Sequence, residues 1–191
     1  AQQLVSANAE FQPILRGLLR PIHHRLLPNL ERVFGSDSSS EAQRLSAANA
    51  FADYAASDLD RLSSLLALAT PEQFDVIYPL VAANPTAAVT DYLAEIAATV
   101  PPDDMGSVER VPFGQRRANA AVSLLRLGEP EKVLPVFNWT DDPEALTQFI
   151  FRCKPRGVGV ETILDLLDRV AAVPDRYPRD ARYALMLTVG E

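Results

Sequence analysis

Apolar residues recur along the chain at spacings of three and four, the pattern of a helix that buries one of its sides. Five segments show the full i, i+3, i+4, i+7 spacing: Ala47, Ala50, Phe51 and Tyr54; Leu62, Leu65, Leu66 and Ala69; Ala118, Ala121, Val122 and Leu125; Leu146, Phe149, Ile150 and Cys153; Ile163, Leu166, Leu167 and Val170. No sustained period-two alternation and no Asn-Gly or Asp-Gly hairpin signal accompanies them. The pattern predicts an all-α chain.

Side chains that cap helices mark several expected starts, because the first helical turn leaves backbone N–H groups without partners. Two S/T-x-x-E/Q patterns predict capping boxes, and three residue-proline pairs predict further starts. The boxes are Ser38 with Glu41 and Thr70 with Gln73, and the pairs are Asn84-Pro85, Glu129-Pro130 and Asp142-Pro143. Gly128 is expected to end a helix. Pro28, Pro79 and Pro135 are expected to kink or divide helices.

Proline and acidic residues gather between positions 100 and 112, in the stretch VPPDDMGSVERVP. This stretch predicts a connection over 101–112 between N-terminal helical repeats (1–100, acidic) and C-terminal helical repeats (113–191). Residues 116–129 (RRANAAVSLLRLGE) align with 178–191 (PRDARYALMLTVGE) at an offset of 62. That offset fits about two helix pairs of a HEAT-like array. We therefore expect the last repeat to be truncated, which would leave an apolar helix face uncovered, so that this end packs against another copy of the chain or is less ordered.

Three runs also resemble a known family: RRANAAVSLLRLGEPEKVLPVF from Arg116, SEAQRLSAANAFADYAASD from Ser40, and TPEQFDVIYPLV from Thr70. They are similar to the HEAT-like helical region of large multidomain bacterial proteins that also carry a serine/threonine protein kinase domain, a formylglycine-generating (sulfatase-modifying factor) domain, or both. The resemblance implies a HEAT-like α-solenoid, a right-handed superhelix of antiparallel helix pairs. It carries over no catalytic residue, because the motifs of those reactions belong to the neighbouring domains. It departs at residues 138–140 and 153–159.

The charge of the chain argues against several partners. A formal net charge of −7 disfavours nucleic acid, whose phosphates require clustered Lys and Arg. Between positions 33 and 108 eleven acids face two bases, so this half is strongly acidic. No apolar run approaches the twenty residues of a membrane span, and the first residues do not resemble a signal peptide. The single cysteine fits a reducing, cytoplasmic compartment.

Few residues could carry chemistry. His23 and His24 point about 100° apart on a helix and cannot easily share a metal. Cys153 falls on an apolar stripe, which favours a buried thiol over a nucleophile. The pairs Asp103-Asp104 and Asp141-Asp142 have no calcium-loop pattern around them and are expected in turns. We expect no catalytic, cofactor or metal site.

A candidate interaction surface combines an aromatic ring with arginines, the composition of interface hot spots. It comprises Arg116, Arg117, Trp139, Arg152 and Arg156. The alternatives are a tryptophan that packs a turn and arginines that pair with acids of a neighbouring repeat.

These features predict a non-catalytic HEAT-like scaffold that binds protein, either the kinase domain of its own polypeptide or another protein, without cofactor, nucleic acid or membrane. One alternative is a nucleic-acid-binding or DNA-glycosylase-like HEAT-repeat protein, which would need a basic groove. Another is a hydrolase or transferase, which would need a pocket with two or more convergent titratable groups.

Overall fold

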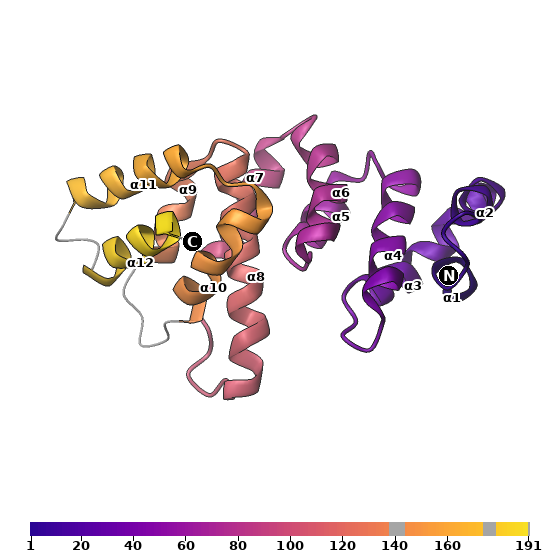
Figure 1. The fold of residues 1–191 in the computed structure, drawn as a ribbon, viewed down its shortest axis with the longest axis horizontal. Helices are drawn as coiled ribbons and strands as arrows, with labels where there is room; N and C mark the ends of the chain where they lie inside the picture. The colour runs from indigo at the N-terminus through magenta and orange to yellow at the C-terminus, as the bar shows by residue number, and fades with distance from the viewer. Residues whose placement is uncertain (138–143, 174–178, 191) are drawn as a thin grey trace. The chain divides into compact units, whose positions relative to one another are not determined.

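The structure, a computed structural model, describes residues 1–137, 144–173 and 179–190 (Figure 1). Within these ranges every regular element is a helix and no strand occurs, which confirms the all-α prediction. The chain forms two compact units, residues 1–84 and 85–191. The connection expected at 101–112 therefore lies inside the second unit. Helix α8 (Ser107–Arg126) already begins within it and continues through Pro112.

The first unit contains the helices α1 to α6. Their bounds are α1 (Gln2–Val5), α2 (Gln12–Leu19), the 3-10 helix η1 (Arg20–Ile22), α3 (His23–Phe34), α4 (Glu41–Tyr54), α5 (Leu59–Leu66) and α6 (Pro71–Ala82). α4 packs against α3 and α6, and α5 packs against α6. Phe34 and Phe51 meet edge to face at 6.2 Å between ring centroids, and both are buried.

Gln73 joins three helices of this unit. It is buried, and its side-chain amide donates to the carbonyl oxygens of Phe34, at the end of α3, and Arg44, in α4, at 3.0 and 3.3 Å. Its Oε1 accepts from the backbone N–H of Thr70 at 2.9 Å, while Thr70 Oγ1 accepts from the Gln73 N–H. The predicted Thr70–Gln73 capping box is thus confirmed, and the same glutamine also caps a neighbouring helix.

Two of the predicted helix starts were wrong. α4 begins at Glu41, which occupies the first helical position, whereas the partner residue of a capping box occupies the third. Ser40 therefore caps α4, and Gln43 completes the capping box. α7 (Ala87–Ala98) begins after Thr86, whose Oγ1 accepts from the Val89 N–H, instead of after Asn84. The start expected at Asp142 lies outside the described residues.

The second unit contains α7 to α12. After α7 and α8 come α9 (Pro130–Val133), η2 (Leu134–Phe137), α10 (Glu144–Cys153), η3 (Lys154–Arg156), α11 (Val160–Ala172) and α12 (Arg179–Gly190). α8 packs against α7 and α10, and α12 packs against α10 and α11 (Figure 1). Gly128 ends α8 as predicted: its φ of 79° is left-handed, and the N–H groups of Gly128 and Glu129 close back onto Leu125 and Leu124.

Small side chains make up much of the packing around α8. Ala118, Ala120 and Ala121 are fully buried. Gly114 lies against α10, where a Cβ atom at this position would come within 2.7 Å of the Glu144 Cγ and 3.3 Å of its backbone carbon. The absence of a side chain at Gly114 therefore allows α8 to approach α10 closely.

The effect of proline differs among the three sites predicted to kink or divide helices. α3 and α6 each continue through their internal proline, Pro28 and Pro79. At Pro135 the α-helical turn of α9 has already given way to the 3-10 helix η2.

Candidate interaction surfaces

An unburied apolar stripe follows α2 and η1. Phe11, Ile14, Leu18 and Ile22, spaced by three or four residues, are 57%, 60%, 71% and 43% exposed. No residue of α2 is buried. Four large apolar side chains in one exposed row are unusual for an isolated soluble surface and typical of a surface that another molecule covers. We call these four residues the α2–η1 stripe.

The segment that carries the α2–η1 stripe is basic. Residues 11–30 contain Arg16, Arg20 and Arg25 and no acid. The Arg16 guanidinium forms an ion pair with the carboxylate of Asp53 in the same unit. Arg20 and Arg25 are exposed, and neither forms an ion pair with the described residues. Arg20 is two positions from both Leu18 and Ile22 and therefore points away from the stripe, whereas Arg25 follows Ile22 by three positions. The stripe therefore combines apolar contact area with one available positive charge near its end.

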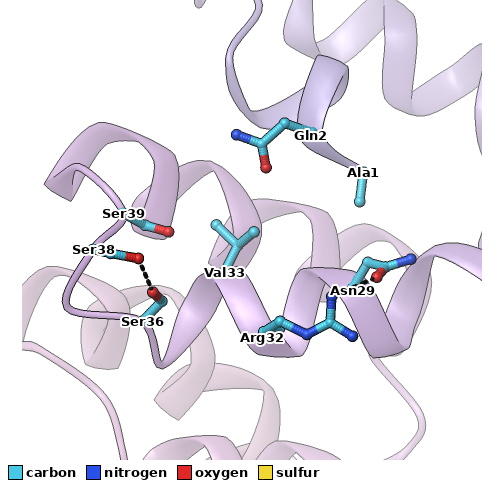
Figure 2. Close-up of a pocket in the computed structure, with 8 residues that line it drawn as sticks. All are labelled: Ala1, Gln2, Asn29, Arg32, Val33, Ser36, Ser38 and Ser39. Atoms are coloured by element: carbon cyan, nitrogen blue, oxygen red, sulfur yellow. Dashed lines mark hydrogen bonds between the residues drawn. The ribbon is translucent and has the colours of Figure 1, made fainter.

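A polar cleft of about 450 Å³ lies elsewhere in the first unit (Figure 2). Gln2 extends over it from α1, Val33 and Arg32 line it from α3, and the loop that precedes α4 contributes serine side chains. The serines are Ser36, Ser38 and Ser39, and Asn29 and Ala1 complete the lining. Arg32 donates to Asn29 Oδ1 at 3.1 Å, and the hydroxyls of Ser36 and Ser38 are 2.8 Å apart.

The chemistry of the cleft follows from this lining. Among the described residues that line it, Arg32 is the only one with a charged side chain, and none is a carboxylate. Hydroxyl, amide and guanidinium groups supply hydrogen-bond donors, which suits a small oxyanion better than a cation. Without a titratable base or a nucleophile next to one, the cleft offers no group for acid–base or covalent catalysis.

The predicted arginine pair on α8 divides between surface and core. Arg116 is exposed, whereas Arg117 is buried and donates from its Nε to the carbonyl oxygen of Ala97 at 3.1 Å. That carbonyl belongs to the last turn of α7, where helical carbonyl groups need donors. Arg117 therefore joins α7 to α8 and cannot contribute to a basic ridge.

The other predicted interaction residues are also dispersed. Arg156 is buried, and its carbonyl oxygen accepts from Arg126 Nη1 at 2.7 Å. Arg152 is half-buried and bonds Gln148, and desolvation lowers its pKa, against the opposing effect of Glu144. Trp139 lies outside the described residues. Of the five predicted residues, Arg116 is exposed and Arg152 is partly so.

The cysteine, histidine and aspartate side chains considered as nucleophiles or metal ligands do not form a catalytic or metal-binding cluster among the described residues. Cys153 is buried, and burial raises the pKa of its thiol to about 12, despite the opposing effect of Arg156. His23 Nδ1 lies 2.8 Å from the carbonyl oxygen of Arg20, and Asp103 and Asp104 are exposed in a turn. Among the described residues no three His, Cys, Asp or Glu side chains lie close enough to hold a metal ion.

Neither the stripe nor the cleft was predicted from the sequence. The stripe carries the same three-and-four spacing as the buried segments, so its pattern alone indicates a helix without indicating whether anything covers it. The cleft has no sequence signal beyond the serine run at 38–40.

Comparison of the chain with models of known protein families, with curated proteins and with solved structures found no match. Over the described residues, no helix combines the length and the apolar character needed to span a bilayer.

Proposed function

We propose that this chain is a non-catalytic, HEAT-like helical scaffold that binds another protein through the α2–η1 stripe. The observation that carries the proposal is the exposure of Phe11, Ile14, Leu18 and Ile22 in one row. Large apolar and aromatic side chains contribute most of the energy at the centre of protein interfaces, and arginine is enriched there too. Arg25, which is exposed and follows Ile22 by three positions, supplies that second component.

The resemblance of the sequence to the helical region of kinase-bearing and sulfatase-modifying-factor proteins suggests the first partner to test. In a polypeptide of that kind, the kinase domain would be the nearest protein surface, and the scaffold would act in the cytoplasm. A solenoid arrangement of the helix pairs would present the stripe at the edge of a stacked array.

A nucleic-acid-binding role receives less support. It requires a continuous basic groove. Arg117 and Arg156 are buried, and the chain carries a formal charge of −7. No described observation favours this alternative over a protein partner.

The test is site-specific photo-crosslinking in cells that produce the protein. A crosslinking side chain at Leu18 should yield discrete protein adducts, whereas the same side chain at Leu68, which is also exposed (50%), should not. The adduct partner, purified, should bind the chain at least tenfold more weakly after Leu18→Asp, because a charge would replace an apolar anchor. Equal crosslinking at both positions, or unchanged affinity of the variant, would overturn the proposal.

A further inference from the structure

The hydrogen-bonding groups of the polar cleft come from separate parts of the first unit. In Figure 2 the serine side chains of the loop before α4 lie on one side of Val33, and Arg32 and Asn29 lie on the other. Gln2, on α1, lies above them in the same view. Polar side chains of three segments therefore surround one space of about 450 Å³.

Arg32 supplies the positive charge of the cleft. Its side chain is exposed, donates to Asn29 Oδ1 at 3.1 Å and forms no ion pair with the described residues. A guanidinium carries five N–H donors in a planar fork that fits phosphate and carboxylate oxygens. One bond to an amide oxygen leaves most of these donors for a ligand.

The acidic residues nearest in the sequence do not line the cleft. Asp37 lies within the serine loop, but its carboxylate lies 3.7 Å from Arg44 Nη1, outside the lining. Glu31 and Glu41 are exposed and do not line the cleft either. The net charge of −7 is carried by other surfaces, and salt at physiological strength screens exposed charges beyond about 8 Å. The nearby guanidinium therefore decides which charge the cleft accepts.

The size and the lining of the cleft narrow the choice of ligand. Its volume falls in the range of about 300–1,000 Å³ that is usual for small-molecule sites. It corresponds to roughly fifteen water molecules at about 30 Å³ each, more than a single oxyanion fills. Donors on several sides match the oxygens of a tetrahedral phosphate better than the two coplanar oxygens of a carboxylate. Hydroxyl and amide side chains both donate and accept, as the hydroxyl groups of a ligand require.

We propose that this cleft binds a phosphate ester of a small polyhydroxy compound. The phosphate lies between Arg32 and the serine hydroxyls, and the hydroxyl groups of the ligand extend toward Gln2 and Asn29. This site is separate from the α2–η1 stripe, because no residue of α2 or η1 lines it. A ligand that bridges α1, α3 and the serine loop would also stabilise the first unit, since it binds the folded chain alone.

NMR titration of the full, ¹⁵N-labelled chain with D-ribose 5-phosphate tests the site. Because Ala1 lines the cleft, the purification tag is placed at the other end of the chain. Backbone amide resonances of residues 29–39 should shift along a saturable curve, with a dissociation constant below about 1 mM. D-Ribose, which lacks the phosphate, should cause no shift. Inorganic phosphate, which lacks the hydroxyl groups, should bind about tenfold more weakly.

Two variants and a matched control locate the ligand. Arg32→Gln should weaken binding of ribose 5-phosphate by about tenfold or more, because it removes charge-assisted hydrogen bonds. Ser39→Asp should abolish binding, because it places a carboxylate in the cleft. Arg20→Gln removes the same charge from an exposed arginine of the first unit that does not line the cleft, and it should leave the affinity unchanged. Spectra that otherwise superpose on that of the unaltered chain would establish that the variants fold.

Four results would overturn the proposal. They are the absence of a saturable shift up to about 10 mM ribose 5-phosphate, equal binding of ribose, equally tight binding of inorganic phosphate, and equal weakening by Arg32→Gln and Arg20→Gln. The last result would indicate general attraction to the positive charges of the unit. None of these results changes what crosslinking at Leu18 reports, so the cleft and the stripe can fail separately.

Discussion

Replacing Gln73 should destabilise the first unit far more than a helix-capping role would require. The Phe34 carbonyl oxygen lies in the last turn of α3, where it has no intrahelical donor, and the Gln73 amide supplies one at 3.0 Å. Leaving a buried acceptor without a partner costs about 1–3 kcal/mol. Loss of the bond to the Thr70 N–H adds about 1 kcal/mol, as for other helix caps. Gln73→Ala should therefore lower the free energy of unfolding by about 3 kcal/mol, the midpoint of these two costs combined.

Gln43 offers a matched control within the same unit. It is also the third residue of a capping box, with its Oε1 accepting from the Ser40 N–H at 3.0 Å, but its amide bonds only Ser6 Oγ at the surface. Gln43→Ala should cost about 1 kcal/mol. The difference of about 2 kcal/mol corresponds to roughly a 30-fold change in the ratio of folded to unfolded chain.

Urea-dependent hydrogen exchange, read by mass spectrometry on peptides from residues 1–84, reports the stability of this unit separately. Gln73→Leu should fill most of the vacated volume while still removing the donor, so it separates packing from hydrogen bonding. If Gln73→Leu or Gln73→Ala cost no more than Gln43→Ala, the bridging role assigned to this amide would be refuted.

The remaining predictions concern the second unit. Gly114→Ala should lower the free energy of unfolding by about 1–3 kcal/mol, because its methyl group would meet Glu144 at 2.7 Å. Thermal unfolding measures this loss, and the control Gly17→Ala, whose Cβ would lie in open space, should show no loss of stability. Cys153 should resist alkylation at pH 8 in the folded chain and react in urea, and rapid labelling of the folded chain would contradict its burial. Since folding raises the pKa of this thiol to about 12, its contribution to stability is complete below the unfolded value of about 8.5 and declines as the pH rises above it. Cys153→Ala should remove that decline from a series of urea titrations.

Local sequence patterns predicted the helical class and much of the core, because both depend on neighbours three and four positions away. Ala118, Ala121 and Val122 are all fully buried, as their shared stripe indicates. The Thr70 box and the Gly128 stop were predicted for the same reason, since a cap bonds within a single turn.

Features that depend on distant parts of the chain were not predictable in this way. The buried position of Arg117 depends on the α7 carbonyl that it reaches, and the cleft depends on α1 approaching the serine loop. Leu18 is likewise exposed because no other helix of the first unit covers that side of α2, and the spacing of residues in the sequence does not reveal this. Even so, the sequence of α8 contained a usable signal, because Arg117 lies one turn before the buried Ala121 and so on the same side of the helix, whereas Arg116 points about 100° away.

The alanines of α8 also determine where this chain can vary. Ala118, Ala120 and Ala121 are fully buried, so a larger side chain at any of them would have to displace packed neighbours, typically at a cost of about 1–3 kcal/mol. Distant homologues would then keep small residues here while exchanging Leu, Ile and Phe among themselves. A search for such homologues should therefore score the small-residue register of α8 as heavily as its large apolar positions.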